Sequence, residues 1–161
     1  MKYLLILLLF IPVNGFSKEY LLTEERLRID NIFCLAQNIY FEARNQSELG
    51  KEAVTEVVLN RVKSHKYPNE ICEVVKQAKQ NSGRIIRHSC QFSWYCDGKP
   101  DTPGDYRAWV SSMEIAQRIL IKGTRNITEG STHYHSVKVS PYWNRALNRV
   151  VQIDDHIFYK E

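Results

Sequence analysis

Residues 23–44 read TEERLRIDNIFCLAQNIYFEAR, and residues 48–64 read ELGKEAVTEVVLNRVKS. In the first segment apolar residues recur at spacings close to three and four, the period of one helix face. They are Leu27, Ile32, Leu35, Ile39 and Ala43. We predict a helix over residues 23–44, with Thr23 as its N-cap and acidic residues in its first turn. The second segment has a strongly apolar face and predicts a helix over about residues 48–64.

The rest of the chain predicts two further helices, a long loop and a hairpin. A short third helix starts at Pro68 and Asn69. Its inward-facing residues are Ile71, Val74, Val75 and Ala78. Residues 79–104 hold three glycines and two prolines and predict a long loop. A fourth helix covers residues 105–122, with Gly123 as its C′ residue.

Near the C-terminus, residues 149–153 and 156–159 are rich in β-branched and aromatic side chains and flank Asp154-Asp155. This pattern predicts a hairpin. The predicted fold class is therefore α+β, a mostly helical domain with a small C-terminal β element.

Composition indicates one ordinary globular domain. The chain has 161 residues, of which 43% are hydrophobic and 25% are charged, and its formal net charge is +4. These values exclude a disordered or low-complexity chain. We expect no nucleic-acid partner, because such proteins usually carry a concentrated basic stripe. No repeat or flexible linker divides the sequence.

The N-terminus has the pattern of a signal peptide. Lys2 is followed by an apolar run at residues 4–13 and by the small residues Gly15 and Ser17. A bilayer-spanning helix needs roughly 20 apolar residues, which is more than this run offers. We assign residues 1–17 to the signal peptide and 18–161 to the mature domain, with cleavage after Gly15 or Ser17 left open. The chain is then exported to the periplasm, cell wall or exterior, without stable membrane insertion. The alternatives are a buried helix and a retained anchor.

Four cysteines lie in the mature part: Cys34, Cys72, Cys90 and Cys96. An even number in an exported chain predicts two disulfides, and three pairings are possible. A zinc site is the alternative, but the spacing of Cys90 and Cys96 is wider than zinc sites usually have. We predict no metal.

Glu42 is the carboxylate most suited to catalysis. It shares the inner side of its helix with Asn38 and Ile39, and it follows Tyr40 and Phe41. Desolvation by apolar neighbours raises the pKa of a carboxyl group, which suits a general acid near neutral pH. The alternative is a structural salt bridge with Arg44 or Arg61.

Two other groups could contact a ligand. In a strand, His133 and His135 would face one side and Tyr134 the other. The two histidines could act as general bases, bind a metal or contact a sugar. The alternative is a hydrogen-bonded pair at the edge of the core. Gln91, Phe92 and Trp94 lie between two cysteines and could form a stacking surface for sugar rings, or fill the core.

Several spaced motifs together carry a resemblance. These are IYFEAR at residues 39–44, GKEAV at 50–54, VLNRV at 58–62, CQFSW at 90–94 and THYH at 132–135. Over about residues 33–145 the chain resembles the SleB-type cell wall hydrolases, relatives of the spore cortex-lytic enzymes. The resemblance implies a lysozyme-like domain that acts on peptidoglycan glycan strands. It further implies a lytic transglycosylase that cuts between N-acetylmuramic acid and N-acetylglucosamine and leaves 1,6-anhydro-muramic acid ends.

The resemblance also implies roles for residues. Glu42 occupies the position of the catalytic glutamate, acting first as acid and then as base, without cofactor or metal. We expect sugar contacts from Tyr40, Gln91, Phe92, Trp94, His133, Tyr134 and His135. Many relatives have Gly-Glu-Pro where this chain has Asn45-Gln46-Ser47, so Glu48 is the nearby carboxylate that could replace a second acid.

Other functions remain open at this point. A muramidase that uses water would share Glu42, but it usually needs a second carboxylate. An amidase or peptidase would use Cys34 or Cys90 with His133 or His135, and it needs a free thiol. A non-catalytic glycan-binding module would use the aromatic loop alone. We expect the protein to act as a monomer.

Overall fold

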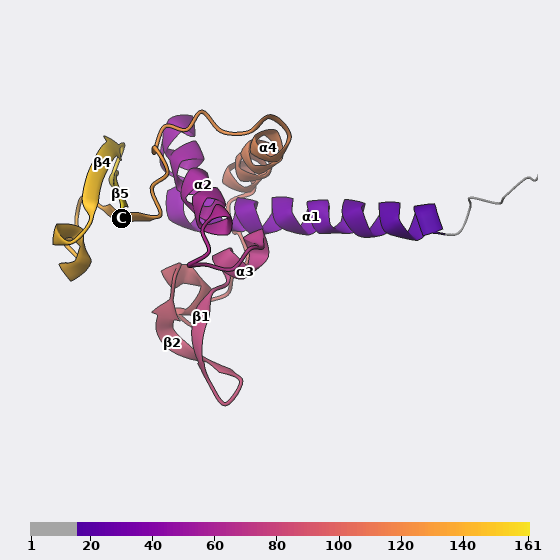
Figure 1. Cartoon of the computed structure of the whole chain (residues 1–161), viewed down its shortest axis with the longest axis horizontal. Coiled ribbons are helices and arrows are strands. Elements are labelled where there is room, and N and C mark those ends of the chain that lie inside the picture. The colour runs from indigo at the N-terminus through magenta and orange to yellow at the C-terminus, as the bar shows by residue number, and fades with distance from the viewer. Residues whose placement is uncertain (1–15) are drawn as a thin grey trace, which may run out of the picture.

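A computed structural model describes residues 16–161 (Figure 1). The helices are α1 (Phe16–Ala43), α2 (Glu48–Lys63), α3 (Ile71–Val75) and α4 (Tyr106–Lys122). The C-terminal half of α1 packs against the other three helices, whereas its N-terminal half projects away from them (Figure 1). The helical body is therefore organised around the end of α1 that carries Glu42.

The start of α1 corrects one prediction. Thr23 lies inside the helix, and its hydroxyl donates to the carbonyl of Glu19 one turn earlier. Thr23 is thus not an N-cap, because the helical segment extends toward the N-terminus as far as Phe16. Of the predicted signal peptide, residues 1–15 lie outside the described part of the chain. Between residues 16 and 161, no helix has the length and apolarity needed to cross a membrane.

Helices α2 and α4 agree with prediction, and polar caps explain where they begin. The Ser47 side chain accepts from the backbone N–H of Gly50 at 3.1 Å, and the Asp105 side chain accepts from that of Ala108 at 3.1 Å. Gly123 ends α4 with φ of +80°, as expected for a C-terminal glycine. Helix α3 is shorter than predicted and begins at Ile71.

The predicted loop over residues 79–104 is largely structured. It contains strands β1 (Ala78–Asn81) and β2 (Arg84–Cys90), paired antiparallel, and a 3-10 helix, η1 (Ser93–Cys96). Ser82 and Gly83 join the strands with φ of +49° and +76°, which suits a two-residue hairpin turn. Ala78, predicted to face inward on the third helix, is instead the first residue of β1.

A three-stranded antiparallel sheet forms the C-terminal part. Strands β3 (His133–Ser136), β4 (Asn148–Ile153) and β5 (His156–Lys160) have the spatial order β3-β5-β4, and a 3-10 helix, η2 (Tyr142–Arg145), precedes β4. The predicted hairpin corresponds to β4 and β5 and is confirmed. The strand expected at residues 133–135 is also present.

Two buried clusters hold the fold together. The larger joins α1 to α2, α3, η1 and α4, with Leu35, Ile39 and Ile119 at its centre. The smaller packs the end of α1 and the first half of α2 against Ile153 and Phe158 of the sheet. Tyr134 contacts both clusters, so it marks the junction between the helical body and the sheet.

Both predicted disulfides are formed. Cys34 pairs with Cys72, which ties α1 to α3, and Cys90 pairs with Cys96, which ties the end of β2 to η1. All four cysteines are thereby used, and none is a free thiol. The zinc interpretation of these cysteines is wrong, since each sulfur is bonded to another.

Candidate functional site

Glu42 lies in the last turn of α1, at the junction of the two clusters. Its side chain is partly buried, and its carboxylate accepts a hydrogen bond of 3.0 Å from the Tyr134 hydroxyl. Tyr134 comes from β3 and is held there by pairing with Phe158 of β5. The contact between Glu42 and Tyr134 therefore joins the helical body to the sheet across the candidate site.

The surroundings of Glu42 favour its protonated form. Burial raises the pKa of its carboxyl group above the usual value. The hydrogen bond from Tyr134 and the charge of Arg61 act in the opposite direction and stabilise the carboxylate. Burial and the neighbouring charge of Glu42 also raise the pKa of the Tyr134 hydroxyl, so Tyr134 remains a hydrogen-bond donor.

Arg61 is a buried cation beside Glu42. It is 5% exposed, its guanidinium lies 5.2 Å from the ring centres of both Tyr67 and Phe92, and its Nε donates to the carbonyl of Thr132. Within residues 16–161, Glu42 forms no ion pair with Arg61 or Arg44. The salt-bridge interpretation of Glu42 is therefore wrong, and Arg61 acts on Glu42 through its charge.

Glu42 opens onto a pocket of about 430 Å³. The lining side chains come from the end of α1, from η1 and from the loop that follows η1. They are Phe41, Glu42, Arg44, Ser93, Trp94, Asp97, Lys99, Pro100 and Asp101. Burial and the charge of Asp97 raise the pKa of Asp101. The pocket thus offers a partly buried acid with further carboxylates and cations around it.

Sequence reasoning missed Asp97, Lys99 and Asp101, because they reach the pocket only through long-range contacts. The Gln37 amide donates to the carbonyl of Asp101 at 3.2 Å, which fixes the loop to α1. The composition of residues 97–105, rich in proline, glycine and aspartate, indicates a loop but carries no sign of which site it borders.

Tyr40, predicted to contact sugar, holds this loop instead. It is 4% exposed, and its hydroxyl oxygen accepts from the backbone N–H groups of Gly104 and Asp105 at 3.0 and 2.9 Å. The structure therefore places Tyr40 behind the pocket wall, where it positions the loop and has no free surface for a ligand.

The predicted aromatic surface is divided between core and pocket. Trp94 stacks on Phe41 with ring centres 4.8 Å apart, and its indole N–H donates to Asn38. It lines the pocket, although little of its surface is exposed. Phe92 is 2% exposed and packs under Arg61, so the structure gives it no surface for a sugar. Gln91 is exposed at the end of β2, outside the pocket.

The two histidines face away from Glu42. His133 and His135 share one face of β3, as predicted, and both rings pack against Trp143 at 5.4 and 5.5 Å. His135 is buried, with Nε2 3.0 Å from the Tyr159 hydroxyl, and burial lowers the pKa of the half-buried His133. The structure does not bring either histidine into the pocket. In the described chain, no three His, Cys, Asp or Glu side chains are arranged to hold a metal ion.

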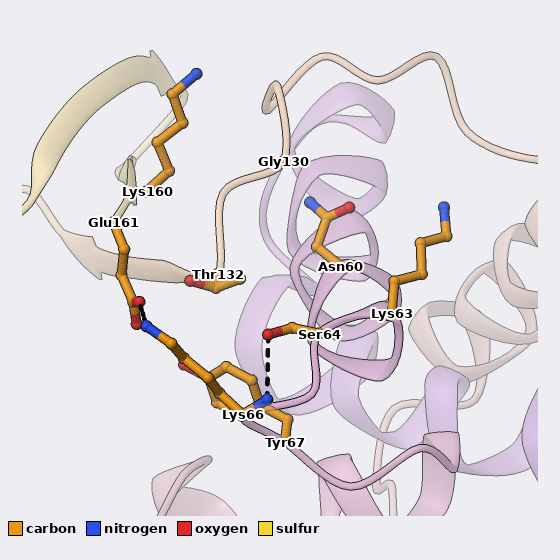
Figure 2. Close-up of a pocket in the computed structure, with 9 residues that line it drawn as sticks. All are labelled: Asn60, Lys63, Ser64, Lys66, Tyr67, Gly130, Thr132, Lys160 and Glu161. Carbon is orange, nitrogen blue, oxygen red and sulfur yellow. Dashed lines mark hydrogen bonds and ion pairs between the residues drawn. The ribbon is translucent and has the colours of Figure 1, made fainter.

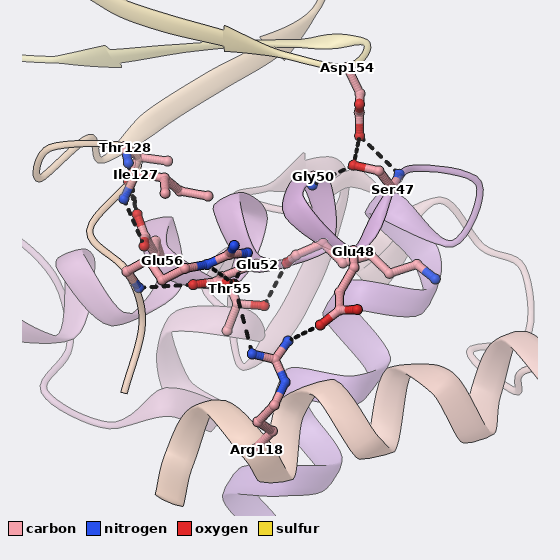
Figure 3. Close-up of polar contacts among 12 residues, drawn as sticks. Ser47, Glu48, Gly50, Glu52, Thr55, Glu56, Arg118, Ile127, Thr128 and Asp154 are labelled. Atoms are coloured by element: carbon pink, nitrogen blue, oxygen red, sulfur yellow. Dashed lines mark hydrogen bonds and ion pairs between the residues drawn. The ribbon is translucent and has the colours of Figure 1, made fainter. Parts of the chain in front are cut away.

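Acidic residues of α2 hold the segment that leads into β3 (Figure 3). The buried carboxylate of Glu56 accepts from the backbone N–H of Ile127 and from the N–H and hydroxyl of Thr128, at 2.7–3.0 Å. Glu52, also buried, binds Arg125, and these contacts lower its pKa despite burial. Both glutamates thus serve to fix the approach to Tyr134.

Glu48 and Gln46 do not border the Glu42 pocket. The Glu48 carboxylate binds Arg118 of α4 at 2.7 Å and lines a separate surface hollow with Arg118 (Figure 3). Gln46 exchanges hydrogen bonds of 3.2 Å with Asp155 in the β4–β5 turn. Neither side chain lies where it could act as a second acid beside Glu42. The structure therefore does not support Glu48 as a replacement for the glutamate that many relatives have at position 46.

Another hollow, of about 400 Å³, lies between the end of α2 and the C-terminal residues (Figure 2). Lys63, Lys66 and Lys160 surround it, and Lys66 forms an ion pair with Glu161. It meets the Glu42 region through Thr132, whose carbonyl binds Arg61, and through Tyr67, whose ring packs against Arg61. Its lysines have no partly buried acid beside them, so the Glu42 pocket is the better candidate site.

The chain is similar to known proteins in sequence and in fold. The sequence profile of the cell wall hydrolase family matches residues 45–159, a range that begins after Glu42. No curated protein matches the chain. The catalytic domain of the germination-specific lytic transglycosylase SleB from Bacillus anthracis is similar in structure, with a TM-score of 0.58 and 23% identity. That alignment covers 81% of this chain and 93% of the other.

The catalytic domain of the Bacillus cereus SleB protein is similar as well. The TM-score is 0.54 at 22% identity, and the alignment covers 81% of this chain and 91% of that one. At this identity the likeness establishes the fold, and it confirms the predicted α+β, lysozyme-like class.

Proposed function

The chain belongs to the cell wall hydrolase family, a family of peptidoglycan-degrading enzymes, and from that premise we propose that it is a lytic transglycosylase. It cuts glycan strands between N-acetylmuramic acid and N-acetylglucosamine, and Glu42 is the acid and then the base. The product ends in 1,6-anhydro-muramic acid.

The reaction needs one carboxyl group in two states. Protonated Glu42 gives its proton to the glycosidic oxygen as the bond from that oxygen to C1 breaks. The resulting carboxylate takes the proton from the C6 hydroxyl, whose oxygen attacks C1. Glu42 ends protonated and ready for another turnover, and no water is consumed.

One observation carries this proposal: a partly buried glutamate with a raised pKa opens onto a pocket. Burial raises the pKa of Glu42 and so favours the protonated form, which is the form that general acid catalysis requires. The Tyr134 hydroxyl and the charge of Arg61 stabilise the carboxylate that the first step creates. The same surroundings therefore support both steps.

The pocket walls suit a sugar ring. Trp94 supplies an edge of apolar surface, and Ser93 and Arg44 supply hydrogen-bond donors near Glu42. Of the residues expected to contact sugar, Trp94 lines this pocket, and Tyr134 is linked to it through its hydrogen bond to the Glu42 carboxylate. For Gln91, His133 and His135, a sugar contact requires a strand that extends beyond the pocket.

A digestion experiment tests the proposal. Peptidoglycan is incubated with the purified, oxidised protein, and the fragments are analysed by mass spectrometry. We expect anhydro-muramoyl ends, one water lighter than reducing ends. Glu42→Gln should lower the rate at least about a hundredfold, because general acid–base catalysis contributes on that order. Glu48→Gln is the matched control and should keep full activity, since Glu48 binds Arg118 away from the pocket.

The other products point to other functions. Reducing ends would indicate a muramidase and would direct attention to Asp101, a carboxylate in the same pocket. Binding to peptidoglycan without any product would indicate a binding module. Cleaved peptides with intact glycans would require a nucleophile other than cysteine, since all four cysteines are in disulfides.

We also propose that the protein is exported and acts as a monomer. Two disulfides favour an oxidising compartment, and peptidoglycan lies outside the cytoplasm. Fractionation of cells that express the full chain, followed by light scattering of the purified protein, tests both statements.

A further inference from the structure

Positive charge is concentrated in one segment of the chain. Residues 74–96 contain four lysines and arginines and no aspartate or glutamate. They are Lys76, Lys79, Arg84 and Arg87. This surplus equals the formal net charge of the whole chain, +4, so positive and negative residues balance over the rest of the sequence. The segment forms the end of α3, the β1–β2 hairpin and η1, and the hairpin projects from the body (Figure 1).

The hairpin is exposed on both faces. Residues 79–88 are all exposed, including Ile85 and Ile86 at 41% each. Within residues 16–161, neither Lys79 nor Arg84 forms an ion pair with a carboxylate. Two free cations on a projecting ribbon are available to an anionic partner.

An irregularity at the base of the hairpin creates a hollow. The strand register shifts between Ala78 and Gln80 of β1. On the opposite strand, β2, His88 adopts a φ of +59°, which is unusual for a residue other than glycine. The hollow measures about 460 Å³. It is lined by seven residues that lie in the two strands or directly next to them. They are Gln77, Ala78, Lys79, His88, Ser89, Cys90 and Gln91.

The hairpin is fixed to the wall of the Glu42 pocket. The Cys90–Cys96 disulfide joins β2 to η1, and the Arg87 guanidinium donates twice to the carbonyl of Asp97, at 2.8 and 3.2 Å. Burial and the charge of Asp97 raise the pKa of Asp101 in the same pocket, and the positive charge of Lys76 partly opposes that rise. The cationic ribbon therefore has a defined position beside the site of cleavage.

We propose that the β1–β2 hairpin binds the anionic peptides that branch from the glycan strand, with Lys79 and Arg84 as the cations that contact their carboxylates. The proposal rests on the proposed function, because the peptide is attached to the muramic acid whose glycosidic bond Glu42 would cleave as acid and then base. A branch leaving the pocket past η1 meets the hollow at the base of the hairpin. The enzyme then prefers strands that carry peptides over bare strands.

A lipid surface is the less suitable partner for this ribbon. Successive residues of a strand point to opposite faces, so Ile85 and Ile86 cannot enter one bilayer surface together. The hollow that contains Lys79 faces the base of the hairpin, near the body of the protein, rather than its tip.

Binding measurements with the Glu42→Gln chain test this proposal without requiring turnover. The probes are insoluble peptidoglycan and the same material after an amidase has removed its peptides. Lys79→Gln with Arg84→Gln should weaken binding to peptide-bearing material about three- to tenfold, as expected for two exposed ionic contacts. Binding to the stripped material should not change. The matched control, Lys122→Gln with Lys138→Gln, changes two exposed cations elsewhere and should leave both affinities unchanged.

Three results would overturn the proposal. An equal loss on both materials would mean that the hairpin contacts sugar. No loss on either would mean that it binds nothing in this polymer. When phosphatidylglycerol vesicles are used as a third probe, a loss confined to them would identify a membrane contact. Failure of the proposed function is read separately, from product analysis of the protein with Glu42 intact.

Discussion

In the proposed reaction, the hydrogen bond between Tyr134 and Glu42 influences the pH range over which Glu42 acts as an acid. Burial raises the pKa of Glu42, and the Tyr134 hydroxyl opposes that rise. In Tyr134→Phe the opposing contact is lost, so the pKa of Glu42 rises further. Activity that needs protonated Glu42 declines as the pH rises through this pKa. The alkaline limb of the pH–rate profile should therefore move to higher pH.

The profile of kcat/KM against pH measures this shift, because it reports groups of the free enzyme. The maximal rate should also fall, since Tyr134 stabilises the carboxylate formed after the first proton transfer. Tyr142→Phe is the control, because Tyr142 is 93% exposed and lies on η2. An unchanged alkaline limb in Tyr134→Phe would show that a group other than Glu42 controls the rate there.

The position of Glu42 on its helix could be predicted from the sequence, whereas its catalytic role stays a prediction. Ile39, Tyr40 and Phe41 precede it directly in the same helix, and these neighbours account for part of its burial. Asp97 and Asp101 could not be predicted, because a contact across 64 residues, from Gln37 to Asp101, brings them to the pocket. The sequence indicated Arg61 only as a possible salt-bridge partner of Glu42.

At the scale of elements, the start of α2 is clamped to the β4–β5 turn. The Asp154 carboxylate accepts from the backbone N–H and the hydroxyl of Ser47, at 2.9 and 2.6 Å (Figure 3). A Cβ atom on Gly50 would lie 2.3 Å from that carboxylate and 2.9 Å from Cβ of Gln46. The close approach therefore requires glycine at position 50.

Gly50→Ala should destabilise the protein by about 1–3 kcal/mol, the usual range for overpacking. Urea denaturation gives this free energy of unfolding directly. Gly104→Ala is the matched control, because a Cβ there meets nothing within 4 Å and the backbone N–H that binds Tyr40 is kept. Equal stability of both variants would mean that the turn moves aside freely and that the clamp contributes little.

The β1–β2 hairpin shows where sequence patterns fail at this scale. Residues 84–88 are exposed on both faces, so they lack the alternation of apolar and polar residues by which a half-buried strand is recognised. The Ser82-Gly83 pair was the available signal for a turn. Helix α4 was predictable because it buries one face, and α2 because its apolar residues recur at helical spacing, although residues 52–58 are all buried. Each helix also has a polar cap at its start.

At the scale of the whole molecule, the candidate site stands where two separately packed parts meet. The helical cluster supplies Glu42 and the pocket walls, and the sheet supplies Tyr134. Glu52 and Glu56 of α2 hold the connection that sets the sheet against the helices. The geometry of the site thus depends on contacts distributed over the chain, beyond the residues that touch the substrate.

The two disulfides should contribute differently to stability and to activity. Cys34–Cys72 closes 38 residues and ties α1 to α3, whereas Cys90–Cys96 closes only 6. On the chain-entropy relation, replacing the first pair with alanine should lower the free energy of unfolding by about 4 kcal/mol, and replacing the second by about 2 kcal/mol. Denaturation of the two double variants under oxidising conditions measures both values.

The effects of the two disulfides on activity should have the opposite order to their effects on stability. The Cys90–Cys96 bond holds η1, which presents Ser93 and Trp94 to the Glu42 pocket, while neither Cys34 nor Cys72 lines that pocket. At a temperature where both variants are folded, loss of Cys90–Cys96 should raise KM several-fold, and loss of Cys34–Cys72 should leave it near the wild-type value. Wild-type KM without the Cys90–Cys96 bond would show that packing of Trp94 on Phe41 is enough to hold that wall.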